Sequence, residues 1–271
     1  MRADQLLVER GLAASRSQAV RLIAGGMRWR DAGTQGTWRA VGKNRDDLPE
    51  TAELELADAA EARYVSRGGL KLEGALRVTG IDATGLQCLD IGQSTGGFTD
   101  CLLQHGAAHV TGVDVGHGQL HARLREDERV TAIEKVNARG LVAADLADEA
   151  ETDPEPCFDL VVGDLSFISQ TLVLPAVVPF LAADGHLLML VKPQFELQPG
   201  QVGKGGIVRD DAMYAVVERR LREACSALSL RVVQWFDSPI EGGDGNHEFF
   251  IHAVRETSGA TGVGRAPATQ L

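Results

Sequence analysis

The chain has 271 residues, of which 44% are hydrophobic and 24% are charged. This length is enough for a three-layer core with a small module left over, so we expect two domains. No apolar run approaches the ~20 residues of a membrane helix, and residues 1–4 lack the apolar segment of a signal peptide. The four cysteines form no C-x-x-C pair, which argues against a disulfide framework or a zinc site. We therefore expect a cytoplasmic protein without a membrane or metal partner.

Positive charge is concentrated at the beginning of the chain. The net charge is −11, yet residues 1–45 hold nine Lys and Arg against three acidic residues, a balance of +6 that leaves −17 for the rest. This asymmetry predicts a module that binds a polyanion, with an affinity that falls steeply as salt rises. Charge alone leaves open a basic surface without a partner. The candidate binding residues of this stretch are Arg2, Arg10, Arg16, Arg21, Arg28 and Arg30.

Residues 1–60 predict a small α+β domain. A short helical pattern ends at Gly11, and a second helix begins after the N-cap Ser15 and ends at residues 25–26. Alternating runs then predict strands at residues 27–30, 37–41 and 53–56. The string at residues 4–19 resembles the alpha-L RNA-binding motif shared by a ribosomal small-subunit protein and several RNA-modifying enzymes. The resemblance implies that the polyanion is RNA.

Residues 61–67 form the predicted linker, in which Arg67 is a further candidate RNA-binding residue. Ser66 is placed to cap a helix over residues 69–79, which has an apolar face. Lys71 lies on another face of that helix. On its own it reads as a solvated lysine.

The chain is organised around residues 88–100, where an apolar run with an acid leads into three glycines and a helical pattern from Thr95. Such a turn lets the backbone approach a nucleotide cofactor closely. A dinucleotide site, as in a dehydrogenase, would have glycine where Ser94 stands. The pattern favours S-adenosylmethionine (SAM), with a turn that binds no ligand as the alternative. The candidate cofactor-binding residues of this stretch are Asp90, Gly92, Ser94, Thr95, Gly96, Gly97 and Phe98.

Strands and helices alternate from residue 86 onward, which predicts a sheet covered on both faces. Strand 110–114 ends in Asp114, about 20 residues after the turn, at the position of a ribose-binding acid. Asn137 follows strand 130–134 on a loop that can reach an adenine. Both are candidate cofactor-binding residues.

Three charged residues are expected at one edge of the sheet. Asp164 follows strand 158–163 and Lys192 follows strand 186–191, and open α/β sheets bind ligands at the carboxyl ends of their strands. If the last strand runs antiparallel to the others, Glu248 at its beginning joins them.

The predicted fold is α/β, a Rossmann-like SAM-dependent methyltransferase sheet, mostly parallel with an antiparallel last strand, preceded by a small α+β RNA-binding domain. Residues 203–206 only superficially resemble a phosphate loop and predict a mobile lid. The predicted divisions are an RNA-binding domain at 1–60, a linker at 61–67, a methyltransferase domain at 68–256 and a disordered tail at 257–271.

Five strings extend a family resemblance across nearly the whole chain, at residues 64–72, 94–100, 164–168, 192–196 and 202–210. They resemble the TlyA (hemolysin A) family, whose catalytic domain is similar to FtsJ-type RNA 2'-O-ribose methyltransferases. The resemblance implies SAM as cofactor, ribosomal RNA or ribosomal subunits as partner, a cytidine as target, and a linker that influences SAM binding. It also implies a catalytic tetrad at Lys71, Asp164, Lys192 and Glu248. Gln93 departs from the small residue common in the family.

The chemistry of methyl transfer to a ribose hydroxyl requires alignment of oxygen, carbon and sulfur, and a group that accepts a proton. Our hypothesis is that Lys192 orients and deprotonates the hydroxyl, that Asp164 and Glu248 hold Lys192, and that Lys71 tunes charge or contacts an RNA phosphate. The alternatives are a membrane-lytic hemolysin, an RNA-binding protein without catalysis, and a methyltransferase for a small molecule. The last has little use for a basic N-terminal module.

Overall fold

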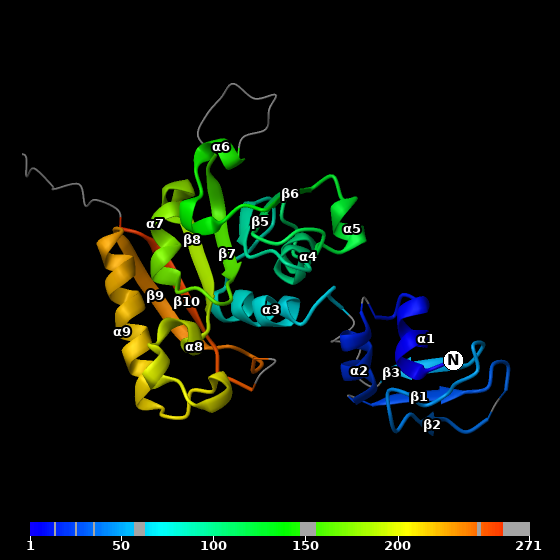
Figure 1. Cartoon of the computed structure of the whole chain (residues 1–271). Helices are drawn as coiled ribbons and strands as arrows, with labels where there is room; N and C mark the ends of the chain where they lie inside the picture. Colours follow the sequence, from blue (N-terminus) through cyan, green and yellow to red (C-terminus); the bar gives the residue numbers. More distant parts are fainter. Residues whose placement is uncertain are drawn as a thin grey trace, which may run out of the picture.

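The computed structural model describes residues 1–13, 15–24, 26–34, 36–56, 63–146, 156–242 and 245–256. This part of the chain forms a three-stranded sheet and a seven-stranded sheet (Figure 1). Residues 61–62 of the predicted linker and the predicted tail at 257–271 lie outside it. Among its helices, none combines the length and the apolar character needed to cross a membrane.

The three-stranded sheet has the order β2-β1-β3, and β1 is antiparallel to both neighbours. Two helices precede it, and Leu7, Leu22 and Met27 are buried in the shared core. Ser15 accepts a hydrogen bond from the Gln18 N–H (3.3 Å), as expected of the predicted cap. The elements are α1 (Ala3–Glu9), α2 (Arg16–Ala24), β1 (Met27–Arg30), β2 (Arg39–Ala40) and β3 (Glu53–Leu56).

The seven-stranded sheet has the order β6-β5-β4-β7-β8-β10-β9. The neighbours from β6 to β8 are parallel, whereas β10 is antiparallel to β8 and to β9. The predicted fold class, with its antiparallel last strand, is therefore confirmed. The strands are β4 (Gln87–Ile91), β5 (His109–Asp114), β6 (Val130–Glu134), β7 (Phe158–Asp164), β8 (Leu181–Val191), β9 (Leu230–Asp237) and β10 (Phe249–Arg255).

Helices cover both faces of this sheet because its central strands are apolar on both sides. Leu89 and Val161 pack in one core with residues of α7 and α9, while Cys88 and Leu160 pack in a second core with residues of α3, α4 and α5. The helices are α3 (Gly68–Thr79), α4 (Gly97–Gln104), α5 (Ala122–Arg125), α6 (Ala143–Leu146), α7 (Leu174–Val177), α8 (Pro193–Glu196) and α9 (Ala212–Ala227). The long helix α9 is absent from the predicted elements.

Two helices begin elsewhere than predicted. The N-cap of α3 is Arg67, and no side chain caps it, so the expected Ser66 cap does not form. Helix α4 begins at Gly97 rather than at Thr95, because Gly96 before it adopts a left-handed conformation. Both differences lie where the turn after β4 meets the start of α3.

The parallel strands end at a common edge, next to which β10 begins. Phe249 pairs with Val191, so Glu248 and Lys192 continue the same register beyond the ends of their strands. The predicted lid at residues 203–206 contains a short 3-10 turn, η5 (Lys204–Gly206). The buried side chain of Asn246 donates to the carbonyl of Gly206 (3.0 Å) and so ties η5 to the loop before β10.

Candidate active site

The turn between β4 and α4 has the backbone that its glycines predict. Gly92, Ser94 and Gly96 have positive φ angles of 83°, 48° and 94°. A Cβ atom at Gly92 would lie 3.0 Å from the carbonyl oxygen of Asp164, so the turn lies against the chain that leaves β7. The N–H of Ser94 donates to the carboxylate of Asp114 (2.8 Å) at the end of β5. The turn is thereby held between its two neighbouring strands.

Gly97, the third glycine of the turn, makes room for the linker. A Cβ atom there would lie 2.1 Å from Ser66 Oγ and 3.0 Å from the nitrogen of Gly69. The linker is also bonded to α4, because the N–H of Val65 donates to Asp100 Oδ2 (2.9 Å). The close approach of α3 to α4 therefore depends on glycine at this position.

Asp90 lies beneath the turn and lines neither of the two cavities described below. Its Oδ2 accepts hydrogen bonds from the N–H (3.1 Å) and the hydroxyl (2.7 Å) of Thr99. Its Oδ1 is buried without a hydrogen-bond partner in the described part of the chain. Burial raises the pKa of Asp90 to about 7. Asp90 therefore supports the turn from below, and its contact with a cofactor stays a prediction.

The side chain of Gln93 is directed at the sheet. Its Nε2 donates to the Thr99 hydroxyl (2.9 Å). It also covers Gly112 in β5, where a Cβ atom would lie 2.0 Å from the Gln93 amide. The residue that departs from the family pattern therefore fills the space above a glycine of the neighbouring strand.

A cavity of about 510 Å³ lies beside the turn, between the ends of β5 and β7. We call it the Asp114 cavity. Asp114 and Asn137, two of the predicted cofactor-binding residues, both line it. Asp114 also accepts a hydrogen bond from the N–H of Gly116 (2.6 Å), and Asn137 Oδ1 accepts one from the N–H of Arg139 (3.0 Å). The apolar part of the lining is Val113, Val115, Val136, Ala138, Leu165, Phe167, Ile168 and Val173.

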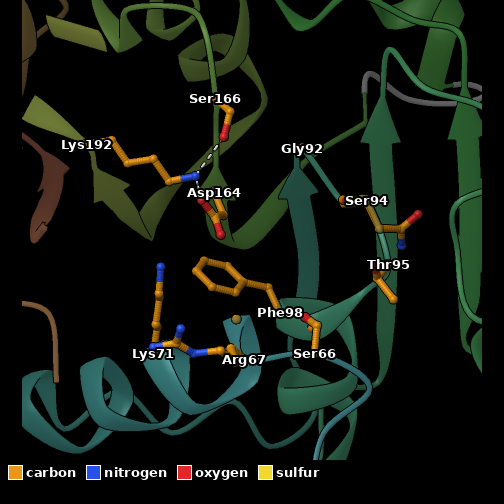
Figure 2. A pocket seen from close by; sticks show the side chains of 13 residues that line it. Ser66, Arg67, Lys71, Gly92, Ser94, Thr95, Phe98, Asp164, Ser166 and Lys192 are labelled. Atoms are coloured by element: carbon orange, nitrogen blue, oxygen red, sulfur yellow. Dashed lines mark hydrogen bonds and ion pairs between the residues drawn. The ribbon is translucent and has the colours of Figure 1, made fainter. Parts of the chain in front are cut away.

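A second cavity, of about 370 Å³, adjoins the first and is called the Lys71 cavity (Figure 2). Thr95, Gly97 and Phe98 of the turn line it, together with Arg67 and Lys71 from the start of α3. Figure 2 shows Lys71 and Lys192 entering the cavity from opposite sides. The two cavities share four lining residues, which are Gly92, Ser94, Asp164 and Ser166. A ligand group in one cavity can therefore meet a ligand group in the other at these residues.

The predicted tetrad is brought together as two ion pairs. Lys192 Nζ lies 2.5 Å from Asp164 Oδ1, and Lys71 pairs with Glu248. Glu248 thus holds Lys71, whereas the sequence-based hypothesis assigned it to Lys192. Lys71 and Glu248 are 7% and 2% exposed, so neither is a solvated surface charge. Burial raises the pKa of Glu248, and the charge of Lys71 opposes that rise.

Most of the predicted RNA-binding arginines have partners within the small domain. Arg2 pairs with Asp4 (2.8 Å), Arg28 with Glu55 (3.0 Å) and Arg30 with Glu53 (2.5 Å). Arg10 donates to the carbonyls of Glu50 and Ala52, so it fastens α1 to the segment before β3. Arg16 is exposed, the side chain of Arg21 lies outside the described residues, and Arg67 donates to the Glu241 carbonyl (3.1 Å).

The charge of the small domain is nearly balanced once β3 is included. Residues 1–56 hold nine basic and eight acidic residues, a balance of +1, because residues 46–56 contribute five carboxylates. Within the described residues, Arg16, Lys43 and Arg45 have no ion-pair partner, and all three are exposed. The basic surface available to RNA is therefore smaller than residues 1–45 predict.

Two residues that follow Asp164 at a distance of two and three positions, Ser166 and Phe167, were not predicted as site residues. Ser166 accepts a hydrogen bond from Lys192 Nζ (2.8 Å). Phe167 is 90% exposed, has a positive φ of 65°, and lies 5.0 Å from the ring of Phe195, between ring centroids. The available signal for Phe167 was an aromatic residue three positions after a strand-end acid, in a segment that the topology places at the ligand-binding edge of the sheet.

The comparisons with known proteins agree with this geometry. Residues 64–255 match the sequence profile of FtsJ-like methyltransferases. The chain is 43% identical to the 16S/23S rRNA (cytidine-2'-O)-methyltransferase TlyA of Mycobacterium tuberculosis, over 96% of this chain and 91% of that protein. It is 39% identical to Hemolysin A of Brachyspira hyodysenteriae, over 94% of this chain and 100% of that protein. A solved structure from Streptococcus thermophilus, provisionally named a hemolysin, has a TM-score of 0.70 at 38% identity and covers 94% of this chain and 88% of its own.

Proposed function

The chain belongs to the FtsJ-like methyltransferase family, and on this premise we propose that it transfers a methyl group from SAM to a ribose 2'-hydroxyl of ribosomal RNA. The observation that carries the proposal is the Lys192–Asp164 pair at the junction of the two cavities. By similarity to TlyA of Mycobacterium tuberculosis, the target base is a cytidine. The cytoplasm, where ribosomes lie, stays the predicted compartment.

The residues of the Asp114 cavity fit SAM. Asp114 offers a carboxylate to ribose hydroxyls at the end of β5, and the apolar lining offers a slot for an adenine beside Asn137. The turn at Gly92 and Ser94 continues toward the Lys71 cavity, where the amino-acid end of SAM can approach backbone groups. When bound, SAM supplies an activated methyl group on a sulfonium.

The ribose hydroxyl is placed at the Lys71 cavity, next to the four shared residues. Lys192 there orients the hydroxyl through an N–H that Asp164 and Ser166 do not occupy. In its neutral form Lys192 would also accept the hydroxyl proton as the oxygen takes the methyl group and the bond from that methyl to sulfur breaks, and Asp164 would then hold the resulting ammonium. The chain thus contributes alignment and a proton acceptor, which are the two requirements of this reaction.

Lys71 and Glu248 act as a buried pair at the opposite wall. Because Lys71 keeps its own carboxylate partner, it can donate an N–H to an RNA phosphate without drawing Asp164 away from Lys192. Arg67, which lines the same cavity, offers a second phosphate contact. The roles of all four tetrad residues are part of the proposal.

We assign RNA docking to residues 1–60, joined through the linker at 61–67 to the methyltransferase domain at 68–256, with 257–271 as a tail. The separate core of α1, α2 and the three-stranded sheet supports this division. Arg16, Lys43 and Arg45 are its best candidates for phosphate contacts, since each is exposed and free of ion pairs among the described residues.

The test is incubation of the protein with labelled SAM and separated ribosomal subunits, followed by mapping of ribose methylation. We expect label at one or a few cytidine ribose positions, and its loss in Lys192→Ala with SAM binding retained. No label in either subunit would contradict the proposal. The hemolysin name of two relatives is tested in parallel by leakage of liposomes, for which we expect none.

A further inference from the structure

Ser166 stands at the junction of the two cavities and has a direct contact with the proposed reacting lysine. It is one of four residues that line both cavities, and among these only Ser94, Asp164 and Ser166 carry a polar side chain. Its Oγ accepts a hydrogen bond from Lys192 Nζ (2.8 Å), on the opposite side of that atom's contact with Asp164 Oδ1 in Figure 2. It therefore borders the position at which methyl transfer is proposed to take place.

The loop that carries Ser166 is firmly held. Glu196, which is 3% exposed, accepts hydrogen bonds from the hydroxyl of Ser169 (2.5 Å) and the N–H of Gln170 (2.7 Å). The side chain of Gln170 in turn donates to the carbonyl of Leu190 in β8 (2.7 Å). The segment after β7 is thus tied to β8 and α8, the elements that flank Lys192.

The left-handed conformation of Phe167 separates two neighbouring side chains. With φ at 65°, the chain turns so that Phe167 is exposed while Ser166 stays on Lys192. A bulky residue rarely adopts this conformation. Held by the contacts of Ser169 and Gln170, it keeps the Ser166 hydroxyl at the junction.

We propose that Ser166 is a positioning residue for methyl transfer, which fixes the direction of the free N–H or lone pair of Lys192. A lysine nitrogen on a flexible stem can rotate about a single carboxylate contact, and its remaining bond direction is then undefined. Asp164 Oδ1 is an ion-pair partner of Nζ without a hydrogen bond, and the Ser166 hydroxyl is its hydrogen-bond acceptor, so the two together direct the rest of Nζ toward the cavity. Ser166 acts through Lys192, and this inference rests on the proposed function.

The experiment compares Ser166→Ala and Ser166→Thr with Ser226→Ala in single-turnover methylation of ribosomal subunits, alongside SAM binding by calorimetry. Ser226→Ala is the control, because it removes a serine hydroxyl that is exposed on α9 and lines neither cavity. We expect Ser166→Ala to slow methyl transfer about tenfold or more, the usual effect of losing a hydrogen bond to a charged group, with the Kd for SAM within about twofold. Ser166→Thr, which restores the hydroxyl, is expected to recover most of the rate.

Three results would overturn the inference: an unchanged rate in Ser166→Ala, an equal loss in Ser226→Ala, or no recovery in Ser166→Thr when that variant is folded and binds SAM. Wild-type protein in the same assay keeps the two proposals apart. If wild type methylates no RNA, the proposed function fails. If wild type is active and Ser166→Ala equals it, only the role of Ser166 fails.

Discussion

Replacement of Asp90 by Asn is expected to stabilise the protein in a pH-dependent manner. The Asp90 carboxyl is buried, its pKa is raised from 3.8 to about 7, and its Oδ1 lacks a hydrogen-bond partner among the described residues. Because the pKa in the folded state is higher, the stability that Asp90 contributes is fully present below about pH 4 and is lost as the pH rises through about 7. Asn keeps an acceptor for Thr99 and has no charge to bury.

The size of the effect follows from the two pKa values. A shift of about three pH units corresponds to up to about 4 kcal/mol, of which about 2 kcal/mol falls between pH 5 and pH 7. Above about pH 8 the advantage of Asp90→Asn is expected to stay constant. Since Asp90 lines neither cavity, the Kd of the variant for SAM is expected to stay within about threefold.

The assay is urea denaturation of wild type and Asp90→Asn at half-unit steps from pH 5 to pH 8.5. Asp82→Asn serves as control, because a hydrogen bond from Thr84 lowers the pKa of the exposed Asp82 and its effect is constant over this range. A stability difference for Asp90→Asn that does not change between pH 5 and pH 7 would refute the reasoning. So would a difference that shrinks as the pH rises.

Three further predictions concern the site. Glu248→Gln leaves the buried Lys71 without an anionic partner, so the free energy of unfolding measured by urea denaturation is expected to fall by about 3 kcal/mol. Adding Lys71→Met to the same chain is expected to recover most of this loss. An unchanged free energy of unfolding in Glu248→Gln would contradict the prediction. Gln93→Ala removes the amide above Gly112 and is expected to lower the free energy of unfolding by about 2 kcal/mol. The Kd for SAM, measured by calorimetry, is expected to change less than about threefold. A tenfold loss of affinity would instead indicate contact with the cofactor. Phe167→Ala is expected to change the free energy of unfolding by less than about 0.5 kcal/mol, because the ring is exposed. It is expected to slow RNA methylation in steady-state assays, because the ring borders the Asp114 cavity. Wild-type kinetics in the variant would count against a substrate contact.

The sequence predicted the sheet and its active edge because both follow from local patterns. Apolar strands that end in Asp114, Asp164 and Lys192 place those residues by topology alone, whatever their side chains contact. Because the last strand is antiparallel, its beginning lies at the same edge of the sheet, and this places Glu248 there. Positions at strand ends are therefore accessible from a single sequence.

The partners that those side chains contact were harder to predict from the sequence. Glu248 pairs with Lys71 rather than Lys192. This pairing depends on where α3 packs against the sheet, which no local sequence pattern encodes. The hydrogen bonds of Asp90 and Gln93 to Thr99 were likewise not predicted, and Gln93 makes its bond while also lining the Lys71 cavity. Pairing depends on the relative placement of elements, which is a property of the whole packed core.

The cross-strand ion pairs of the small sheet have a consequence for how the protein releases counterions. Cations condensed on the RNA are released when an arginine or lysine that is not already neutralised contacts a phosphate. Each such contact steepens the slope of log affinity against log salt concentration by about 0.7 to 0.9. Arg28 and Arg30 are already paired with Glu55 and Glu53. Docking that relies on Arg16, Lys43 and Arg45 would follow only about the second or third power of salt, so this unit can stay bound at ionic strengths that would strip off a uniformly basic arm.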